Sequence, residues 1–319
     1  MSAPTTFRTA ILSTLGHAPD VIEPGRFQRF GTSDRRGDHS GWCKLFDDLG
    51  GGVFGCHRQG ISETWSAAER TTMTLAQRAE HARQVMTATA EREVQQRQRW
   101  AENARRNAHV WAQCVPLVSD DPVTLYLKRR GLDGVWPLPE VLRLHRALPY
   151  WQDGEMLGTY PAMIAPLIAP NGRMVALHRT FLTRDGCKAG VPSPKKVTGA
   201  AGLLAGACIP LHRPVGGCVG IAEGIETALA AWCASAVPTV AAYCAGNLAA
   251  YAWPPGVRRL VVFADADLAG AAAAQSLKAR AMRAGLSVAV MTPTTPGADW
   301  CDVWAQRADL AVAASEAAA

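Results

Sequence analysis

The chain has 319 residues, of which 48% are hydrophobic and 19% are charged, and its formal net charge is +6. This length allows two or three domains with a sizeable buried core. No run of 18 apolar residues without charge is present, and residues 1–14 lack the basic start and apolar block of a signal peptide, so we expect a cytoplasmic protein with no membrane partner.

The basic and acidic residues are unevenly distributed along the chain. Residues 1–120 hold 15 Lys and Arg against 13 Asp and Glu, residues 121–215 hold 12 against 6, and residues 216–319 hold 6 against 8. A basic segment beside an acidic one suits a protein that binds a polyanion with one surface and cations with another. A solvated basic face would explain the same numbers. The nine cysteines include no CxxC pair, which argues against a disulfide framework.

The first 115 residues divide into two parts by composition. Residues 1–65 are rich in Gly and Asp, and residues 41–60 predict a β-hairpin with strands at 42–46 and 53–56. Residues 66–113 contain no Gly or Pro, and Ser66 with Glu69 forms a capping-box pattern. This part predicts one or two long helices that act as a connector rather than as a core.

The middle segment has a mixed pattern. Residues 121–132 predict a short helix with Asp121 as N-cap, Pro122 in the first turn and Gly131 at the end. Residues 160–182 predict an antiparallel strand pair around a Pro-Asn-Gly turn, and a loop follows over residues 183–199.

From residue 216 the pattern alternates between strand and helix. Strands are predicted at 218–223, 238–244, 258–267 and 286–293, with helices at 225–235 and 269–285 and a last helix within 297–307. This alternation indicates a parallel sheet covered on both faces. No P-loop is present, so we expect no built-in helicase motor and treat a replicative helicase as a separate partner.

Acidic residues follow three of these strands. Glu223 ends the first strand, Asp265 and Asp267 end the third, and Asp299 and Asp302 follow the last. Ligands of an open parallel sheet bind at the carboxyl ends of its strands, so these side chains should converge. Because clustered carboxylates repel one another, a hard cation such as Mg²⁺ or Mn²⁺ is the expected partner. Taken alone, Asp267 could simply cap the next helix.

Three motifs, AEGIETALA, VVFADAD and the later aspartate pair, resemble those of the Toprim domain. That domain occurs in DnaG-type primases, topoisomerases, and some nucleases and recombination proteins. The resemblance implies a Rossmann-like Toprim domain at residues 216–319, with Glu223 as acid/base residue and Asp265 and Asp267 as metal ligands. Asp299 or Asp302 fits a later acidic position that varies in the superfamily.

The middle segment resembles the polymerase core of DnaG-type primases, and most of all the primase-like Toprim proteins of plasmids, phages and integrative elements. The motifs are YLKRRGL at 126–132, MVALHRTFL at 174–182 and SPKKVTGAAGLLAG at 193–206. The expected contacts to nucleic acid or nucleotide are the basic side chains Arg129, Arg130, Arg179, Lys195 and Lys196. Each lysine could also be a solvated surface residue, and one of Arg129 and Arg130 could only cap the end of its helix.

The fold class expected for the whole chain is α/β with four parts. They are a small β-rich region at 1–65, a helical connector at 66–115, a mixed α+β primase-core subdomain at 120–215 and the Toprim domain at 216–319. The first region occupies the place of the primase zinc ribbon. Its four candidate zinc ligands, His39, Cys43, Cys56 and His57, contain no CxxC or CxxH pair, so we predict no zinc site.

We interpret the sequence as a DNA primase that makes RNA primers from ribonucleoside triphosphates on a single-stranded DNA template. A Toprim-type nuclease would share the carboxylates without needing the basic motifs. A non-catalytic accessory protein that binds single-stranded DNA is the third possibility, and intact Glu223, Asp265 and Asp267 argue against it.

Overall fold

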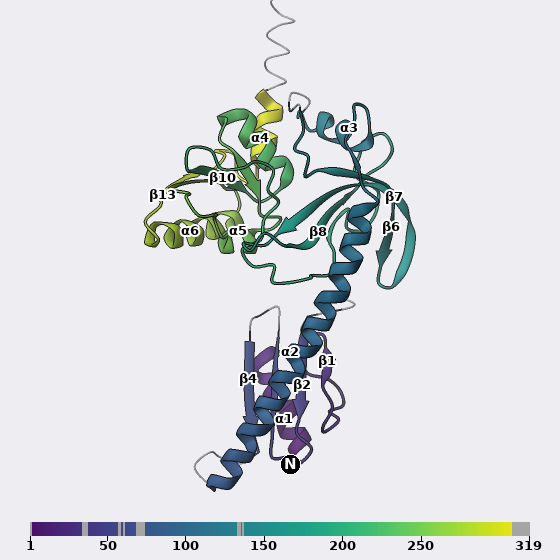
Figure 1. Cartoon of the computed structure of the whole chain (residues 1–319), viewed down its shortest axis with the longest axis vertical. Helices are drawn as coiled ribbons and strands as arrows, with labels where there is room; N and C mark the ends of the chain where they lie inside the picture. Colours follow the sequence, from purple (N-terminus) through teal and green to yellow (C-terminus); the bar gives the residue numbers. More distant parts are fainter. Residues whose placement is uncertain are drawn as a thin grey trace, which may run out of the picture. The chain divides into compact units, whose positions relative to one another are not determined.

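The computed structural model describes residues 2–33, 38–56, 59, 61–67, 74–132, 135 and 137–307. The chain divides into two compact units, residues 1–98 and 99–319, and the division falls inside a long helix (Figure 1).

The N-terminal unit is a four-stranded antiparallel sheet with a helix on it. The strands are β1 (Gln28–Phe30), β2 (Gly41–Leu45), β3 (Gly51–Cys56) and β4 (Ile61–Ser66), in that order. The predicted hairpin is confirmed as β2 and β3. Helix α1 (Ala3–Leu15) was not predicted; it buries Phe7, Ile11 and Leu15, which lie four residues apart and therefore on one helical face.

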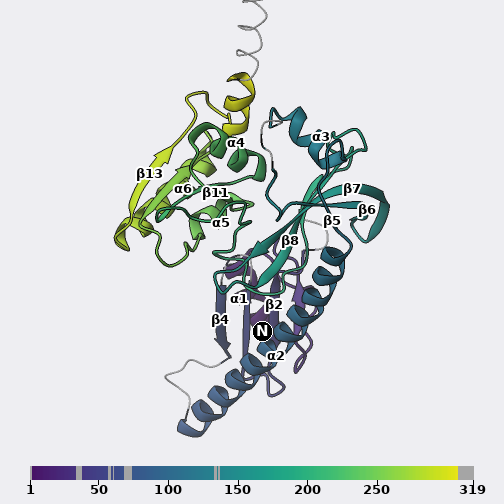
Figure 2. The ribbon, with the colours of Figure 1, turned by 45° about the horizontal axis from the view of Figure 1, so that its top comes forward.

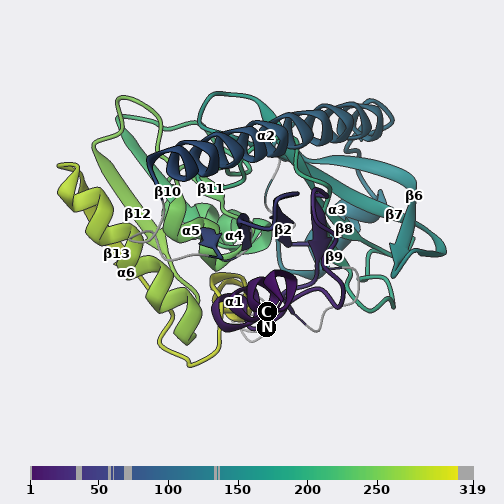
Figure 3. The same ribbon diagram turned by 90° about the horizontal axis from the view of Figure 1, so that it is seen from below.

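Helix α2 (Leu75–Ala112) lies within the segment predicted as helical, and it runs without a break (Figure 3). The predicted capping-box start at Ser66 is wrong, because Ser66 is the last residue of strand β4, and Glu69 lies outside the described residues. Its N-terminal part is more than a connector. Ala88 is buried in one cluster with Trp42, Phe46 and Val53 of the sheet and the loop after β2. Nearby, Lys44 of β2 pairs with Glu91 at 2.5 Å. This part of α2 therefore completes the core of the N-terminal unit.

The second unit begins with a five-stranded antiparallel sheet (Figure 2). Its strands, in spatial order, are β5 (Val115–Pro116), β6 (Arg143–Gln152), β7 (Glu155–Ile168), β8 (Met174–Phe181) and β9 (Lys195–Val197). The predicted pair at 160–182 is confirmed as β7 and β8, whereas β9 lies inside the segment predicted as a loop. Helix α3 (Pro122–Arg129) begins as predicted, because the Asp121 side chain accepts hydrogen bonds from the backbone N–H groups of Val123 and Thr124.

The second sheet of this unit is parallel throughout, in the order β11 (Thr239–Ala241), β10 (Cys218–Ala222), β12 (Arg259–Phe263), β13 (Ser287–Met291). Alternate residues along a strand face opposite ways, so each face receives its own helices. Ala222 and Phe263 belong to the cluster of α4 (Ile225–Ser235), while Ile221 and Val262 belong to that of α5 (Ala245–Ala250) and α6 (Leu268–Arg283). Figure 1 shows α4 on one side of this sheet and α5 and α6 on the other. The predicted parallel sheet with helices on both faces is confirmed.

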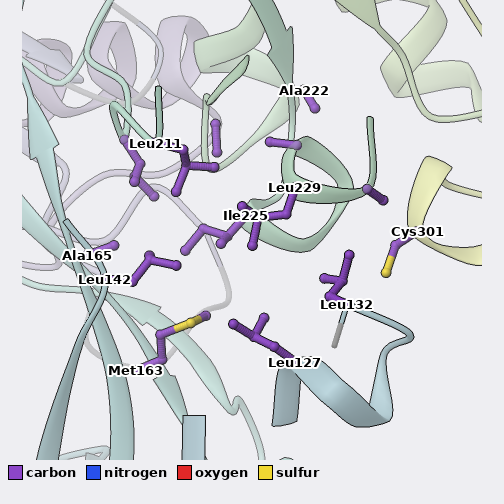
Figure 4. Close-up of a cluster of buried hydrophobic side chains, with 14 of the residues drawn as sticks. Leu127, Leu132, Leu142, Met163, Ala165, Leu211, Ala222, Ile225, Leu229 and Cys301 are labelled. Carbon is purple, nitrogen blue, oxygen red and sulfur yellow. The ribbon is translucent and has the colours of Figure 1, made fainter. Parts of the chain in front are cut away.

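One hydrophobic cluster joins the two sheets of the second unit (Figure 4). Leu127 of α3, Met163 of β7 and Leu229 of α4 lie in it, each at most 1% exposed. Burial of three such side chains contributes roughly 2 kcal/mol each. The α3 motif and the carboxylate-bearing sheet are therefore held together by a shared core.

None of the helices in the described parts of the chain combines the length and apolar character that a membrane span requires.

Candidate active site

The site is built where two adjacent parallel strands end. Strands β10 and β12 pair in register, with Ala222 opposite Phe263. Glu223 follows Ala222 directly, and Asp265 lies two residues beyond Phe263. Both carboxylates therefore leave the sheet at its carboxyl edge, as the strand pattern predicted.

Asp265 is the most perturbed carboxylate of this edge. Its Oδ1 atom is buried and has no hydrogen-bond partner among the residues that the structure describes. Burial raises the pKa of Asp265 to about 7, and the negative charges of Glu223, Asp299, Asp267 and Asp302 add to this effect. Burial also raises the pKa of Glu223, helped by Asp267 and opposed by the positive charge of Lys195. The acidic residues predicted from the strand ends thus interact electrostatically as one group.

The turn after β12 is fixed by the start of α6. Asp267 is the N-cap of α6, and its Oδ1 accepts a hydrogen bond of 2.6 Å from the backbone N–H of Gly270. A Cβ atom at Gly270 would lie only 2.7 Å from the carbonyl oxygen of Asp265, so the close approach of helix and turn requires glycine here. Asp267 therefore caps the helix, and its side chain remains exposed.

Asp299 and Asp302 begin the last helical segment, residues 300–307. Each side chain accepts a hydrogen bond from the other residue's backbone N–H, at 2.9 Å and 3.2 Å. The guanidinium of Arg130 lies 3.8 Å from Asp299 and 3.6 Å from Asp302. A cation supplied by the protein thus already balances part of this acidic pair.

The chemistry of the edge fits a hard divalent cation. Its acidic side chains offer carboxylate oxygens, which Mg²⁺ and Mn²⁺ prefer, and the Asp265 Oδ1 atom has no hydrogen-bond partner within the described ranges. Among the described residues, no three His, Cys, Asp or Glu side chains form a ready-made metal cluster. The assignment of Glu223, Asp265, Asp267, Asp299 and Asp302 as ligands stays a prediction.

A pocket of about 200 Å³ lies between the acidic edge and the basic middle segment. Of the predicted residues it brings together Glu223, Asp265, Asp299, Arg130 and Lys195. The predicted residues outside its lining are Asp267, Asp302, Arg129, Arg179 and Lys196. One half of the predicted site therefore meets in a single pocket that carries both signs of charge.

The predicted basic residues outside the pocket are engaged with the protein. Arg129 pairs with Asp185 at 3.4 Å, and both side chains are exposed. Arg179 donates to the Val197 carbonyl at 3.2 Å, and burial lowers its pKa. Lys196 donates to the Trp151 carbonyl at 2.6 Å and to Gln152 at 2.8 Å. Their binding to nucleic acid or nucleotide stays a prediction.

Several residues that sequence reasoning did not select also line the pocket, among them Tyr126, His178, Lys188 and Glu226. Tyr126 and Glu226 stand inside the quoted motifs YLKRRGL and AEGIETALA, so those motifs offered a signal for them. His178 is buried, and burial lowers its pKa to about 4, which keeps the imidazole neutral. Lys188 is exposed, and no ion pair or hydrogen bond joins its ammonium to a described residue. A lone lysine in a loop carries no sequence signal that would have identified it.

The candidate zinc ligands differ in how deeply they are buried. Cys43 and Cys56 are fully buried in the hydrophobic cluster around Phe7, and burial raises the pKa of Cys43 to about 12. His39 is exposed, and His57 lies outside the described residues. The two thiols serve as small core side chains, and the absence of zinc stays a prediction.

The parallel sheet and its acidic edge place residues 216–307 among α/β domains with a site at the strand ends. Residues 218–309 match the family model of the Toprim domain, so this part of the chain is a Toprim domain. Residues 98–208 match a family described as a domain of unknown function (DUF7146). A comparison with curated proteins found no match.

Several solved structures are similar to the chain. They include a DNA primase domain from Pseudomonas aeruginosa, with 14% identity, a TM-score of 0.34 and coverage of 49% of this chain and 51% of that one. The DnaG primase catalytic domain bound to ssDNA has 14% identity, a TM-score of 0.46 and coverage of 69% and 81%. The Aquifex aeolicus primase, with its zinc-binding and RNA polymerase domains, has 12% identity, a TM-score of 0.35 and coverage of 98% and 84%. The chain spans 51% of the Pseudomonas domain and 47% of a structure of the DnaG catalytic core. These similarities are low.

Proposed function

We propose that the protein is a DNA primase that synthesises short RNA primers on single-stranded DNA by metal-dependent nucleotidyl transfer. The observation that carries the proposal is the pocket in which Asp265, with its raised pKa, faces the cations of the middle segment. A nucleoside triphosphate with its divalent cation needs both signs of charge side by side. A pocket for metal alone would not need the lysines.

The acidic and the basic residues have different tasks in this proposal. The carboxylates Glu223, Asp265, Asp267, Asp299 and Asp302 would hold Mg²⁺ or Mn²⁺, which when bound neutralises charge on the reacting phosphate. Lys188, Lys195 and Arg130 line the same pocket and would bind phosphate oxygens. The raised pKa of Glu223 suits it to accept the proton of the attacking 3′-hydroxyl.

The remaining predicted cations, Arg129, Arg179 and Lys196, are proposed to contact the template backbone. A single-stranded DNA template and ribonucleoside triphosphates are the partners that follow from the reaction. A separate replicative helicase and a cytoplasmic location belong to the same proposal.

The direct test is incorporation of labelled ribonucleotides on single-stranded DNA, with Mg²⁺, with Mn²⁺ and with a chelator. We expect template-dependent products of short length that disappear when the metal is removed. The same reactions are examined for cleavage of the DNA. Metal-dependent cleavage without incorporation would identify a Toprim nuclease, and binding of single-stranded DNA with neither reaction would identify an accessory protein.

A further inference from the structure

Three sequence motifs meet at one buried glutamate beside the pocket. Glu226, in the first turn of α4, has a side chain that is only 5% exposed. The hydroxyl of Tyr126 donates a 2.5 Å hydrogen bond to its Oε1 atom, and the ammonium of Lys195 lies 2.9 Å from its Oε2 atom. Helix α3, strand β9 and helix α4 are thus tied together through a single carboxylate.

The two glutamates of the AEGIE sequence have opposite electrostatic environments. Burial alone would raise the pKa of Glu226, but Lys195 and the hydrogen bond from Tyr126 lower it to about 2. The pKa of Glu223 is raised instead. Glu226 is therefore a permanent anion whose two oxygens both have protein partners, and it is a poor candidate for a metal ligand or proton acceptor.

Lys195 is held by Glu226, and its side chain is also partly exposed in the pocket. Its side chain is 39% exposed and lines the pocket with Glu223 and Asp265. An unanchored lysine loses rotamer freedom when it binds phosphate, whereas a lysine already held by a buried anion has lost much of that freedom beforehand.

We propose that Glu226 is a positioning residue that holds the Lys195 ammonium in the pocket, where it binds the triphosphate of the incoming nucleotide. This inference rests on the proposed function. Glu226 touches neither substrate nor metal and acts through Lys195, so its loss changes nucleotide binding more than the rate of the bound complex.

The test is a double-mutant cycle read by binding of a fluorescent ribonucleoside triphosphate and by KM and kcat for primer synthesis. We expect Lys195→Met and Glu226→Gln each to weaken nucleotide binding, by roughly tenfold for Lys195→Met, the scale of one charge-assisted hydrogen bond. Because Glu226 acts through Lys195, adding Glu226→Gln to Lys195→Met should cause no further loss. A purely structural role would make the two losses additive and would lower kcat as well.

Two further variants keep the outcome interpretable. Glu226→Asp retains the charge and should recover part of the affinity, and Tyr126→Phe should cost less than Glu226→Gln. Glu155→Gln, at an exposed site on β7, is the matched control. Thermal melting identifies any variant that fails to fold, in which case Glu226→Asp and Tyr126→Phe decide.

The two proposals fail in distinguishable ways. Wild-type protein that binds the triphosphate but makes no primer overturns the primase function alone. Wild-type affinity in Glu226→Gln, additive losses in the cycle or no triphosphate binding by the wild type overturns the positioning role.

Discussion

The acidic edge of the Toprim sheet and the basic side chains of the middle segment differ in how many hydrogen bonds and ion pairs they make within the protein. Asp265 has a buried oxygen with no hydrogen-bond partner in the described part of the chain, and the charges of four neighbouring carboxylates add to the rise in its pKa. By contrast, Arg129, Arg179 and Lys196 each donate at least one hydrogen bond to the protein. The buried Nε of Arg179 has no hydrogen-bond partner among the described residues. The pocket lysine Lys188 resembles the acidic edge, since its ammonium pairs with no described residue.

This contrast indicates which charged groups can still gain an electrostatic interaction when a ligand binds. A charged group that has found its partner inside the fold contributes to stability, and displacing that partner costs free energy. A group that is left unsatisfied lowers stability until a ligand binds. The residues with the clearest ligand role are therefore expected to be those whose removal does not destabilise the protein.

The largest expected effect is on the acidic side. Asp265→Asn should lower primer synthesis by roughly two orders of magnitude, because one anionic oxygen of the metal site is lost. Initial rates at saturating metal and nucleotide measure this, with Glu155→Gln as the control on an exposed carboxylate. Wild-type activity in Asp265→Asn would remove this residue from the metal site.

On the basic side, Lys188→Ala should raise KM for the nucleotide by about tenfold, as expected for one lost charge-assisted contact to phosphate. Its melting temperature should not change, because the side chain is exposed. Lys278→Ala, on α6 and outside the pocket lining, is the matched control. Equal KM values for the two variants would contradict the proposed role of Lys188.

The pH dependence of stability sharpens the comparison. In the metal-free protein the pKa of Asp265 is about 7, against 3.8 for an ordinary aspartate. The folded state therefore holds a proton that the unfolded state has released, and stability should fall as pH rises from about 4 to 7. Asp265→Asn should remove this decline and be more stable by about 1 kcal/mol at pH 8, a value reduced for solvent screening.

Chemical denaturation in chelator at pH 5 and pH 8 checks this expectation. Wild type and variant should have similar stability at pH 5 and separate at pH 8. Added Mg²⁺ should restore the wild type at pH 8 and have less effect on the variant. A pH-independent difference between the two proteins would point to packing instead of charge.

The smallest effect is expected at the exposed ion pair Arg129–Asp185. Arg129→Ala should change the free energy of unfolding by less than about 0.5 kcal/mol, since such surface pairs contribute little. If Arg129 contacts the template, the salt dependence of single-stranded DNA binding should flatten by about 0.7 on a log–log plot. An unchanged slope would assign Arg129 to the protein surface alone.

Local patterns were sufficient to predict the parallel sheet, its helices and the acidic edge. Buried strands followed by helices give a periodic signal, and the carboxyl ends of parallel strands meet wherever they fall in the sequence. Helix α1 was missed although Phe7, Ile11 and Leu15 carry a helical period, because residues 1–65 were judged together and their later part is rich in glycine and strand signals. Strand β9 has only three residues and is defined by pairing with β8, which no local pattern reports.

Which residues pair with the charged side chains could not be predicted from the sequence. Tyr126 and Glu226 are 100 residues apart, and Arg130 is still further from Asp299. Which basic side chain is already neutralised depends on distances of a few ångströms between separate elements. The sequence therefore indicated which charged residues to consider, while the place of Lys188 in the pocket and the partners of Glu226 emerged only when the segments were placed together.

Arg130 would compete with a divalent ion for Asp299 and Asp302. Its guanidinium shares the charge of Asp299 and Asp302, so a divalent ion that binds these aspartates must contend with it. A phosphate group that draws Arg130 away would leave both aspartates more negative and more attractive to the ion. Metal and nucleotide would then each strengthen the binding of the other by the same factor, because linkage between two ligands is reciprocal. Under the proposed function, the internal cation would keep the affinity for free metal low in the absence of nucleotide, and the complete assembly would form only when both ligands are present.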